Sequence, residues 1–349
     1  MLATDKIFEV LSQINHPELQ RSLIDLQMVR DVQIHDSKVE VTIALTVPNC
    51  PLKDQIESDV HTVIATLPEV KHVSVQWTAM TNEERKALFS GSKEGAAAPF
   101  NHINRVVAVM SGKDGVGKSS VTGLLATALA REGFKVGVLD ADIFGPSIPA
   151  LFGLNGPLEH GPVGMKPLQS RTGVKVISMN LLLESEDQPV IWRGPLISRA
   201  ISRLFAEVMW GNLDYLLVDL PPGTTEASLI ILQSLPVNGI VIVTTPQSLA
   251  SLVLRKAVHI AQTTKIPIVG VVENMAYFVS PDTGKQNFIF GPSHAGEVAL
   301  TSAAPLLARL PMDPQVAALS DAGEIESMTL AEIPVLLKAF IQAVSIMPL

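Results

Sequence analysis

The stretch VVAVMSGKDGVGKSSVTGLLATALA, residues 106–130, decides the fold of most of this chain. The apolar run at its start predicts a buried strand, and the small and apolar residues at its end predict a helix. Between them, Gly112, Gly117, Lys118 and Ser119 satisfy the pattern G-x-x-x-x-G-K-[ST]. A glycine-rich turn that leads from a strand into a helix is the signature of a phosphate-binding loop. The sequence therefore predicts a nucleotide site at this turn.

Each part of this loop has a physical task in holding ATP and Mg²⁺, the cofactors we expect. Glycines let the backbone curl so that successive N–H groups point at one anion, and the helix N-terminus adds its positive dipole end. Lys118 supplies a charge for the β- and γ-phosphates, and the hydroxyl of Ser119 can ligate Mg²⁺. The predicted nucleotide-binding residues of the loop are Gly112, Lys113, Asp114, Gly115, Val116, Gly117, Lys118, Ser119 and Ser120.

Short apolar runs recur beyond this stretch, and longer helical segments separate most of them. Fully apolar strands that alternate with helices are typical of a parallel sheet covered on both faces. We therefore expect an α/β fold, a doubly wound, mainly parallel sheet of the P-loop NTPase type. The predicted strands are Val106–Met110, Val136–Leu139, Val174–Ile177, Leu216–Leu220, Ile240–Val243 and Ile268–Val272.

Carboxylates follow two of these strands. Asp140 and Asp142 come directly after one strand, and Asp219 ends the run YLLVD. Because the carboxyl ends of parallel strands meet at one edge of the sheet, we expect these side chains beside the phosphate loop. A carboxylate after the strand 136–139 can orient a water for in-line attack or hold a magnesium-bound water. Asp219, together with Ser119, is the predicted Mg²⁺ ligand.

The N-terminal part of the chain has a different pattern. Helical spacing near residues 6–13 and from residue 52, with alternating strands at 37–47 and 71–77, predicts a small α/β domain over residues 1–80. Small and polar residues then predict a linker over residues 81–102. The nucleotide-binding domain is expected to cover residues 103–349.

Composition excludes several classes of protein. The chain of 349 residues is 47% hydrophobic and 17% charged, which favours a folded core over disorder. No apolar run approaches the roughly 18 residues that span a bilayer, and no signal peptide begins the chain, so we expect a cytoplasmic protein without a membrane partner. The net charge of −8 argues against nucleic acid as a partner. A single cysteine, Cys50, excludes an intrachain disulfide.

Several motifs together resemble the Mrp/ApbC family of P-loop ATPases. The loop KDGVGKS is similar to the KGGxGK[ST] loop of the MinD/ParA class, with Asp114 in place of a glycine. The N-terminal VPNCP, residues 47–51, resembles the SufT-like domain that often precedes Mrp proteins. The motifs that carry the resemblance are MSGKDGVGKSS (110–120), DADIFGPSIP (140–149), VIWRGP (190–195), WGNLDYLLVDLPPGT (210–224), VTTPQSLA (243–250) and VVENMAYF (271–278).

The resemblance implies a slow ATPase that forms a homodimer and assists iron–sulfur cluster transfer to apo-proteins, with apo-proteins or assembly scaffolds as partners. Catalytic roles fall to Lys113, which would reach the phosphates of the second copy, to Lys118, and to Asp142, which would position the attacking water. Asn274 would read the edge of the adenine, helped by Asp313. Asp114 places a negative charge near the phosphates, so we expect weakened nucleotide binding.

The chain departs from the family at the cluster ligands. Mrp proteins usually carry Cys-x-x-Cys after the ENM motif, whereas this chain has Ser280 and Thr283 there. Hydroxyl groups are poor ligands for iron–sulfur clusters, which thiolates hold, so the usual bridging site is absent. Cys50 precedes a predicted helix, where a thiolate is favoured. Two interpretations of Cys50 are equally supported: a reactive thiol or transient iron ligand, and an inert, partly buried residue.

Three functions therefore stay open. The leading one is an Mrp-type ATPase in iron–sulfur protein maturation, with an unusual cluster site or an accessory role. The second is a cluster-free regulator or adaptor whose nucleotide state controls partner binding. The third is a MinD-like positioning ATPase, which would need a basic amphipathic C-terminal helix for membrane binding. The tail AEIPVLLKAFIQAVSIMPL has one lysine, Lys338, and is more typical of a helix that packs on the core.

Overall fold

The computed structural model of this protein describes residues 4–16, 22–35, 37–45, 53–80, 97, 100–142, 145–161, 164–178, 194–247 and 250–347. They fall into two compact units. The first is built from the chain up to Phe100 together with His160–Met165, and the second from Asn101–Glu159 and Lys166–Leu349. The motif VIWRGP lies almost wholly outside the described residues, as does VPNCP with Cys50.

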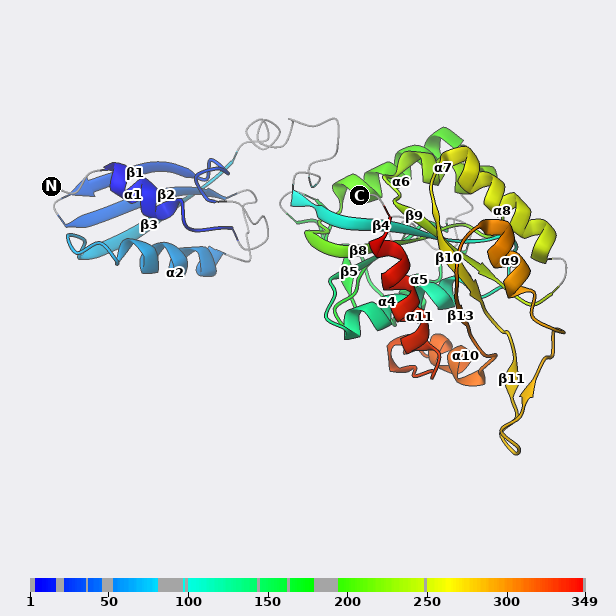
Figure 1. Cartoon of the computed structure of the whole chain (residues 1–349). Coiled ribbons are helices and arrows are strands. Elements are labelled where there is room, and N and C mark those ends of the chain that lie inside the picture. Colours follow the sequence, from blue (N-terminus) through cyan, green and yellow to red (C-terminus); the bar gives the residue numbers. More distant parts are fainter. Residues whose placement is uncertain are drawn as a thin grey trace. The chain divides into compact units, whose positions relative to one another are not determined.

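The first unit is a three-stranded sheet with two helices, labelled in Figure 1. The strand order is β1-β2-β3, with β1 antiparallel and β3 parallel to β2. Alternating residues of the central strand are buried, and the helices contribute apolar residues such as Ile7, Ile56 and Val60 to the same core. Its elements are α1 (Thr4–Leu11), β1 (Val29–His35), β2 (Lys38–Leu45), α2 (Lys53–Ile64) and β3 (His72–Ala79).

The second unit contains an eight-stranded sheet in the order β13-β10-β9-β4-β8-β5-β7-β6. Every neighbouring pair is parallel except β6 and β7, which confirms the mainly parallel, doubly wound sheet. The six predicted strands are all present. The strands are β4 (His102–Ser111), β5 (Val136–Asp140), β6 (Leu168–Gln169), β7 (Lys175–Ser178), β8 (Asn212–Asp219), β9 (Gly239–Thr244), β10 (Ile268–Glu273) and β13 (Leu306–Arg309).

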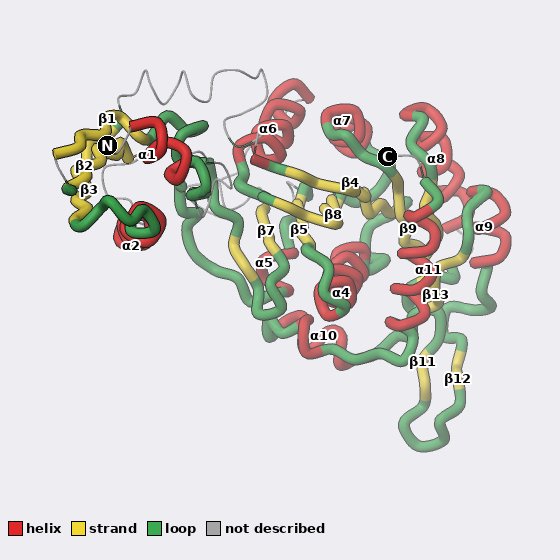
Figure 2. Tube along the Cα trace, turned by 60° about the vertical axis from the view of Figure 1, so that its left-hand side comes forward, coloured by secondary structure: helices red, strands yellow, loops and turns green. Residues whose placement is uncertain are grey.

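Helices cover both faces of this sheet (Figures 1 and 2). On one face, α4 packs on β4, β5 and β8, and α11 packs on α4, β10 and the edge strand β13. On the other face, α6, α7 and α8 follow one another across the sheet. The helices are α4 (Lys118–Arg131), α5 (Ile148–Leu151), α6 (Gly194–Glu207), α7 (Glu226–Ser234), α8 (Ala250–Thr264), α9 (Ala295–Ser302), α10 (Pro314–Asp321) and α11 (Ile333–Ser345), with a 3₁₀ turn at Ile325–Ser327.

The order of the strands determines where a ligand can bind. β4 lies between β8 and β9, so the chain leaves β4 at the point where the connections turn to opposite sides of the sheet. In open α/β sheets, ligands bind at the carboxyl ends of the strands at such a point. The phosphate loop begins here, directly after Ser111.

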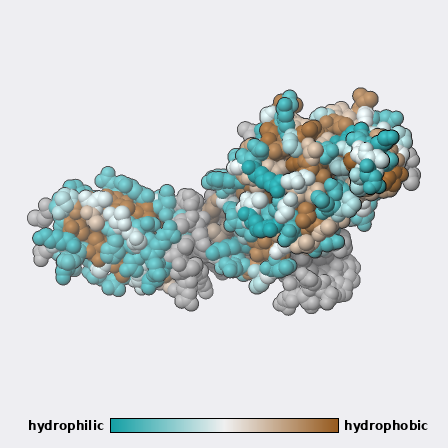
Figure 3. Space-filling model, turned by 90° about the horizontal axis from the view of Figure 1, so that it is seen from below, coloured by the Kyte–Doolittle hydropathy of each residue, from teal (hydrophilic) through white to brown (hydrophobic). Residues whose placement is uncertain are grey.

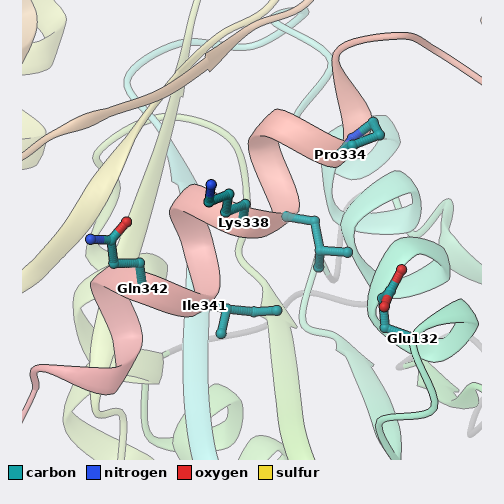
Figure 4. A pocket seen from close by; sticks show the side chains of 6 residues that line it. Glu132, Pro334, Lys338, Ile341 and Gln342 are labelled. Carbon is teal, nitrogen blue, oxygen red and sulfur yellow. The ribbon is translucent and has the colours of Figure 1, made fainter.

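The C-terminal helix α11 packs on the core, as its sequence predicts. Leu336 and Phe340 are fully buried against the sheet, and the outer side of the helix lines a groove of about 590 Å³ near the end of α4 (Figure 4). Glu132 and Lys338 are the charged residues of that groove. In the described part of the chain, no helix is long and apolar enough to cross a bilayer. Apolar patches interrupt the polar surface of both units on the face seen in Figure 3.

Candidate functional site

The loop between β4 and α4 has the backbone geometry that its glycines predict. Gly115 and Gly117 have φ angles of 76° and 77°, in the left-handed region that non-glycine residues rarely adopt. Gly117 is the N-cap of α4, so the N–H groups of the first helical turn, from Lys118 onward, begin at the end of the loop. These N–H groups and the helix dipole favour an anion at this point.

Lys118, Ser119 and Asp219 meet at the carboxyl ends of β4 and β8. The Nζ of Lys118 lies 2.5 Å from Oδ2 of Asp219, and the hydroxyl of Ser119 donates to the same oxygen at 2.6 Å. Thr122 donates to Oδ1 of Asp219 at 2.7 Å. The motif did not point to Thr122, although it lies one helical turn after Lys118, on the same side of α4.

The donor set of this cluster fits a nucleotide with Mg²⁺. A hydroxyl and a carboxylate are the oxygen ligands that Mg²⁺ uses in proteins, and a buried ammonium beside them suits phosphate oxygens. Asp219 is fully buried and Lys118 is 6% exposed, so both charges act in a low dielectric. The structure therefore brings together three of the predicted site residues.

Asp140 and Asp142 lie next to this cluster. Asp140 ends β5 and is paired in register with Asp219 on β8. Burial is the main cause that raises the pKa of Asp140 to about 7, and the negative charge of Asp219 adds to it. Asp142 is buried as well, and its Oδ1 accepts a hydrogen bond from the N–H of Gly145 at 3.2 Å.

The raised pKa of Asp140 predicts a pH dependence of stability. An unfolded aspartate titrates near 3.8 and the folded one near 7, so between these values the folded state holds a proton that the unfolded state has released. The free energy of unfolding should therefore fall as pH rises from about 4 to about 7, by at most about 1.4 kcal/mol per pH unit, and then level off. Urea titrations of the nucleotide-free protein at several pH values in this range should show this fall in the free energy of unfolding. In Asp140→Asn, the contribution of Asp140 to the fall should be absent. Parallel curves for the two proteins would contradict this.

The two unusual residues of the loop make contacts within their own chain. The ammonium of Lys113 donates to Oε1 of Gln247, which follows β9. Asp114 is exposed, and its Oδ1 accepts from the N–H of Gly115 at 2.8 Å. Asp114 thus engages one of the loop N–H groups. The weakened nucleotide binding expected from the sequence stays a prediction.

Asn274 lies against the phosphate loop. It follows β10, and its Nδ2 donates to the carbonyl oxygen of Val116 at 2.9 Å. A Cβ atom at Gly117 would collide with that amide nitrogen, so Asn274 closes one side of the loop. Met275, the next residue, has a φ of 55° and approaches Gly117 with its side chain. No local pattern in the sequence indicates this contact.

Asp313 is the N-cap of α10. Its Oδ1 accepts from the N–H of Gln315 at 2.8 Å, an ordinary capping bond at the start of a helix. The structure thus shows that Asp313 caps α10, and the adenine contact that the resemblance implies stays a prediction.

Ser280 and Thr283 lie in the turn of a short hairpin. The strands β11 (Phe278–Val279) and β12 (Gln286–Asn287) pair antiparallel, and the N–H of Gly284 donates to the carbonyl oxygen of Ser280 at 2.9 Å. Thr283 is exposed, and its hydroxyl accepts from the N–H of Lys285 at 3.4 Å. Among the residues that the structure describes, no cluster of three or more His, Cys, Asp or Glu side chains could hold a metal ion.

Comparisons with known proteins identify a family for each of two parts of the chain. Residues 102–345 match the family described as NUBPL iron-transfer P-loop NTPase, and residues 4–77 match the family described as iron-sulfur cluster assembly protein. A protein of Synechocystis sp. named iron-sulfur cluster carrier protein is 41% identical over 319 residues, which cover 90% of this chain and 88% of that protein. A protein of the same name from Deinococcus radiodurans is 40% identical over 91% of this chain and 87% of its own length.

A solved structure is similar as well. The nucleotide-binding protein of Archaeoglobus fulgidus, in complex with ADP, is 44% identical. It matches 65% of this chain and 90% of its own, with a TM-score of 0.60. With a family match over most of its length and relatives of this similarity, the chain belongs to the family of iron-transfer P-loop NTPases.

Proposed function

We propose that this protein binds and hydrolyses ATP with Mg²⁺, and that it uses this cycle to assist iron–sulfur cluster transfer to apo-proteins as a homodimer. The observation that carries the proposal is the cluster of Lys118, Ser119 and Asp219 at the phosphate loop. The relatives named iron-sulfur cluster carrier protein, aligned over about nine-tenths of this chain, support the choice of cargo.

Different residues of the chain have different roles in the proposed hydrolysis. The N–H groups of residues 112–120 and the ammonium of Lys118 bind the phosphates, and Ser119 and Asp219 hold the metal. Bound Mg²⁺ would neutralise charge that develops on the phosphate oxygens. Asp142 orients the attacking water, and its burial keeps that carboxylate in one position. Once the ammonium of Lys113 breaks its hydrogen bond to Gln247, it binds the phosphates held by the second copy of the chain.

Asn274 and Asp313 form the adenine side of the proposed site. The amide nitrogen of Asn274 is engaged by Val116, so its carbonyl oxygen is the atom that would accept from the exocyclic amine of adenine. Oδ1 of Asp313 accepts the helix-capping bond from Gln315, and Oδ2 is the atom that would accept from adenine.

A second function is favoured by the β11–β12 turn. Two hydroxyl residues occupy the positions where Mrp proteins carry cluster cysteines, and hydroxyls do not hold iron–sulfur clusters well. This observation favours a cluster-free regulator or adaptor whose nucleotide state controls partner binding. Cys50, the one thiol of the chain, is the remaining candidate for a thiolate ligand and the residue that separates the two functions.

Anaerobic reconstitution with iron and sulfide, in the presence of Mg²⁺ and ATP, tests the proposal. We expect cluster absorbance in the native protein and its transfer to an apo-ferredoxin, and we expect Cys50→Ser to lose both while ATP hydrolysis continues. Cys50→Ala also lacks the thiol and should give the same result as Cys50→Ser. If the native protein hydrolysed ATP but neither bound nor transferred a cluster, the carrier function would be wrong and the adaptor function would be favoured.

A further inference from the structure

The carboxylate of Asp140 is fully buried and accepts hydrogen bonds from three backbone N–H groups. Its Oδ1 accepts from Asp142 at 3.1 Å, and its Oδ2 accepts from Ser147 and from Ile148, each at 3.0 Å. Ser147 and Ile148 begin the short helix α5. One side chain therefore joins the end of β5, the residue two positions later and the start of the next helix.

These bonds hold the backbone at Asp142 and again at Ser147 and Ile148. The N–H of Asp142 itself is held by Asp140, and the side chain of Asp142 accepts from Gly145, close to the point where Ser147 returns to Asp140. Because Asp140 is excluded from water, no solvent molecule can replace it as the acceptor for these N–H groups. The direction of the Asp142 carboxylate thus depends on the carboxylate two residues before it.

We propose that Asp140 is a positioning residue for ATP hydrolysis, which holds Asp142 in the orientation that water activation requires; this rests on the proposed function. Both oxygens of Asp140 already accept backbone N–H groups, whereas Asp219 accepts from the side chains of Lys118, Ser119 and Thr122. Asp219 thus faces the side chains of the phosphate-loop region and is the proposed metal ligand, whereas Asp140 faces backbone N–H groups and acts on the reaction through Asp142.

Steady-state kinetics of Asp140→Asn test this assignment. The asparagine keeps the size of the side chain and one acceptor oxygen, but it cannot accept all three N–H groups. We expect kcat to fall about 10-fold or more, because a catalytic group that is misplaced by a fraction of an ångström loses much of its effect. The KM for ATP and the Mg²⁺ concentration for half-maximal rate should stay within about twofold of the native values. Amide hydrogen exchange of Asp142 and Ile148 should become faster in the same variant.

Asp214→Asn is the matched control. Asp214 lies at the opposite end of β8, and its Oδ2 accepts the backbone N–H of Lys135 at 2.8 Å, so the same chemical change removes a similar bond away from the site. We expect native kcat in this variant. Folded Asp140→Asn with native kcat, or with a raised Mg²⁺ requirement and native kcat at saturation, would overturn the positioning role. A native protein without any hydrolysis would instead overturn the proposed function, and this inference with it.

Discussion

Replacing Lys118 by alanine is expected to lower the rate of ATP hydrolysis by about 100- to 1,000-fold, the usual loss when one preorganised charge is removed from a transition state. Lys118 is the buried cation of the site, 2.5 Å from Asp219. Its loss also leaves that buried carboxylate without its cation, so we expect the free energy of unfolding to fall by about 3 kcal/mol. Phosphate release and urea unfolding, measured on the same samples, give the two quantities.

Two further variants separate catalysis from stability. Lys118→Arg keeps a positive charge beside Asp219, so much of the stability should return while hydrolysis stays low, because a planar guanidinium does not replace a compact ammonium. Lys135→Ala removes an exposed lysine beyond the end of α4 and should leave hydrolysis unchanged. If Lys118→Ala turned over ATP at the native rate, the assignment of this loop to phosphate chemistry would be wrong.

Replacing Gly117 by alanine is expected to weaken the phosphate loop more than the same change at Gly115. Both glycines have nearly the same positive φ, so both variants carry a strain of about 1–2 kcal/mol. A Cβ at Gly115 meets nothing within 4 Å, whereas a Cβ at Gly117 displaces the amide of Asn274 and breaks its bond to Val116. The broken bond should cost about 1 kcal/mol more. Urea unfolding of the nucleotide-free variants measures this difference, and titration calorimetry with ATP should show weaker binding in Gly117→Ala.

A double-mutant cycle tests whether Asn274 is the cause. In an Asn274→Ala background the collision at Gly117 is removed, so Gly117→Ala and Gly115→Ala should then cost nearly the same. If the excess cost of Gly117→Ala persisted without the Asn274 amide, the collision with Asn274 would not be its cause.

The central strands and the phosphate loop could be predicted because their signals are local. A run such as Val106–Met110 is apolar because the strand is buried on both faces, and the loop residues lie within a few positions of one another. The meeting of Asp140 and Asp219 followed from the rule that ligands gather at the carboxyl ends of parallel strands. Register on adjacent strands confirms it.

Other parts of the molecule carry no local signal. β13 at the edge of the sheet has four residues, and the two strands of the hairpin have two each, too short for a periodic pattern. In β1 the charged residues Arg30 and Asp31 are adjacent, which interrupts the alternation of apolar and polar residues that predicts a strand. The contact of Asn274 with Val116 joins residues 158 positions apart, so only the fold could show it.

A crystal structure of the protein with a non-hydrolysable ATP analogue, and with Mn²⁺ in place of Mg²⁺, tests the central claim most directly. The claim predicts phosphate density along the N–H groups of residues 112–120, anomalous scattering from manganese beside Ser119 and Asp219, and Lys118 moved from Asp219 to the phosphates. An analogue bound elsewhere, or a loop without ligand density and with Lys118 still on Asp219 at saturating analogue, would contradict it.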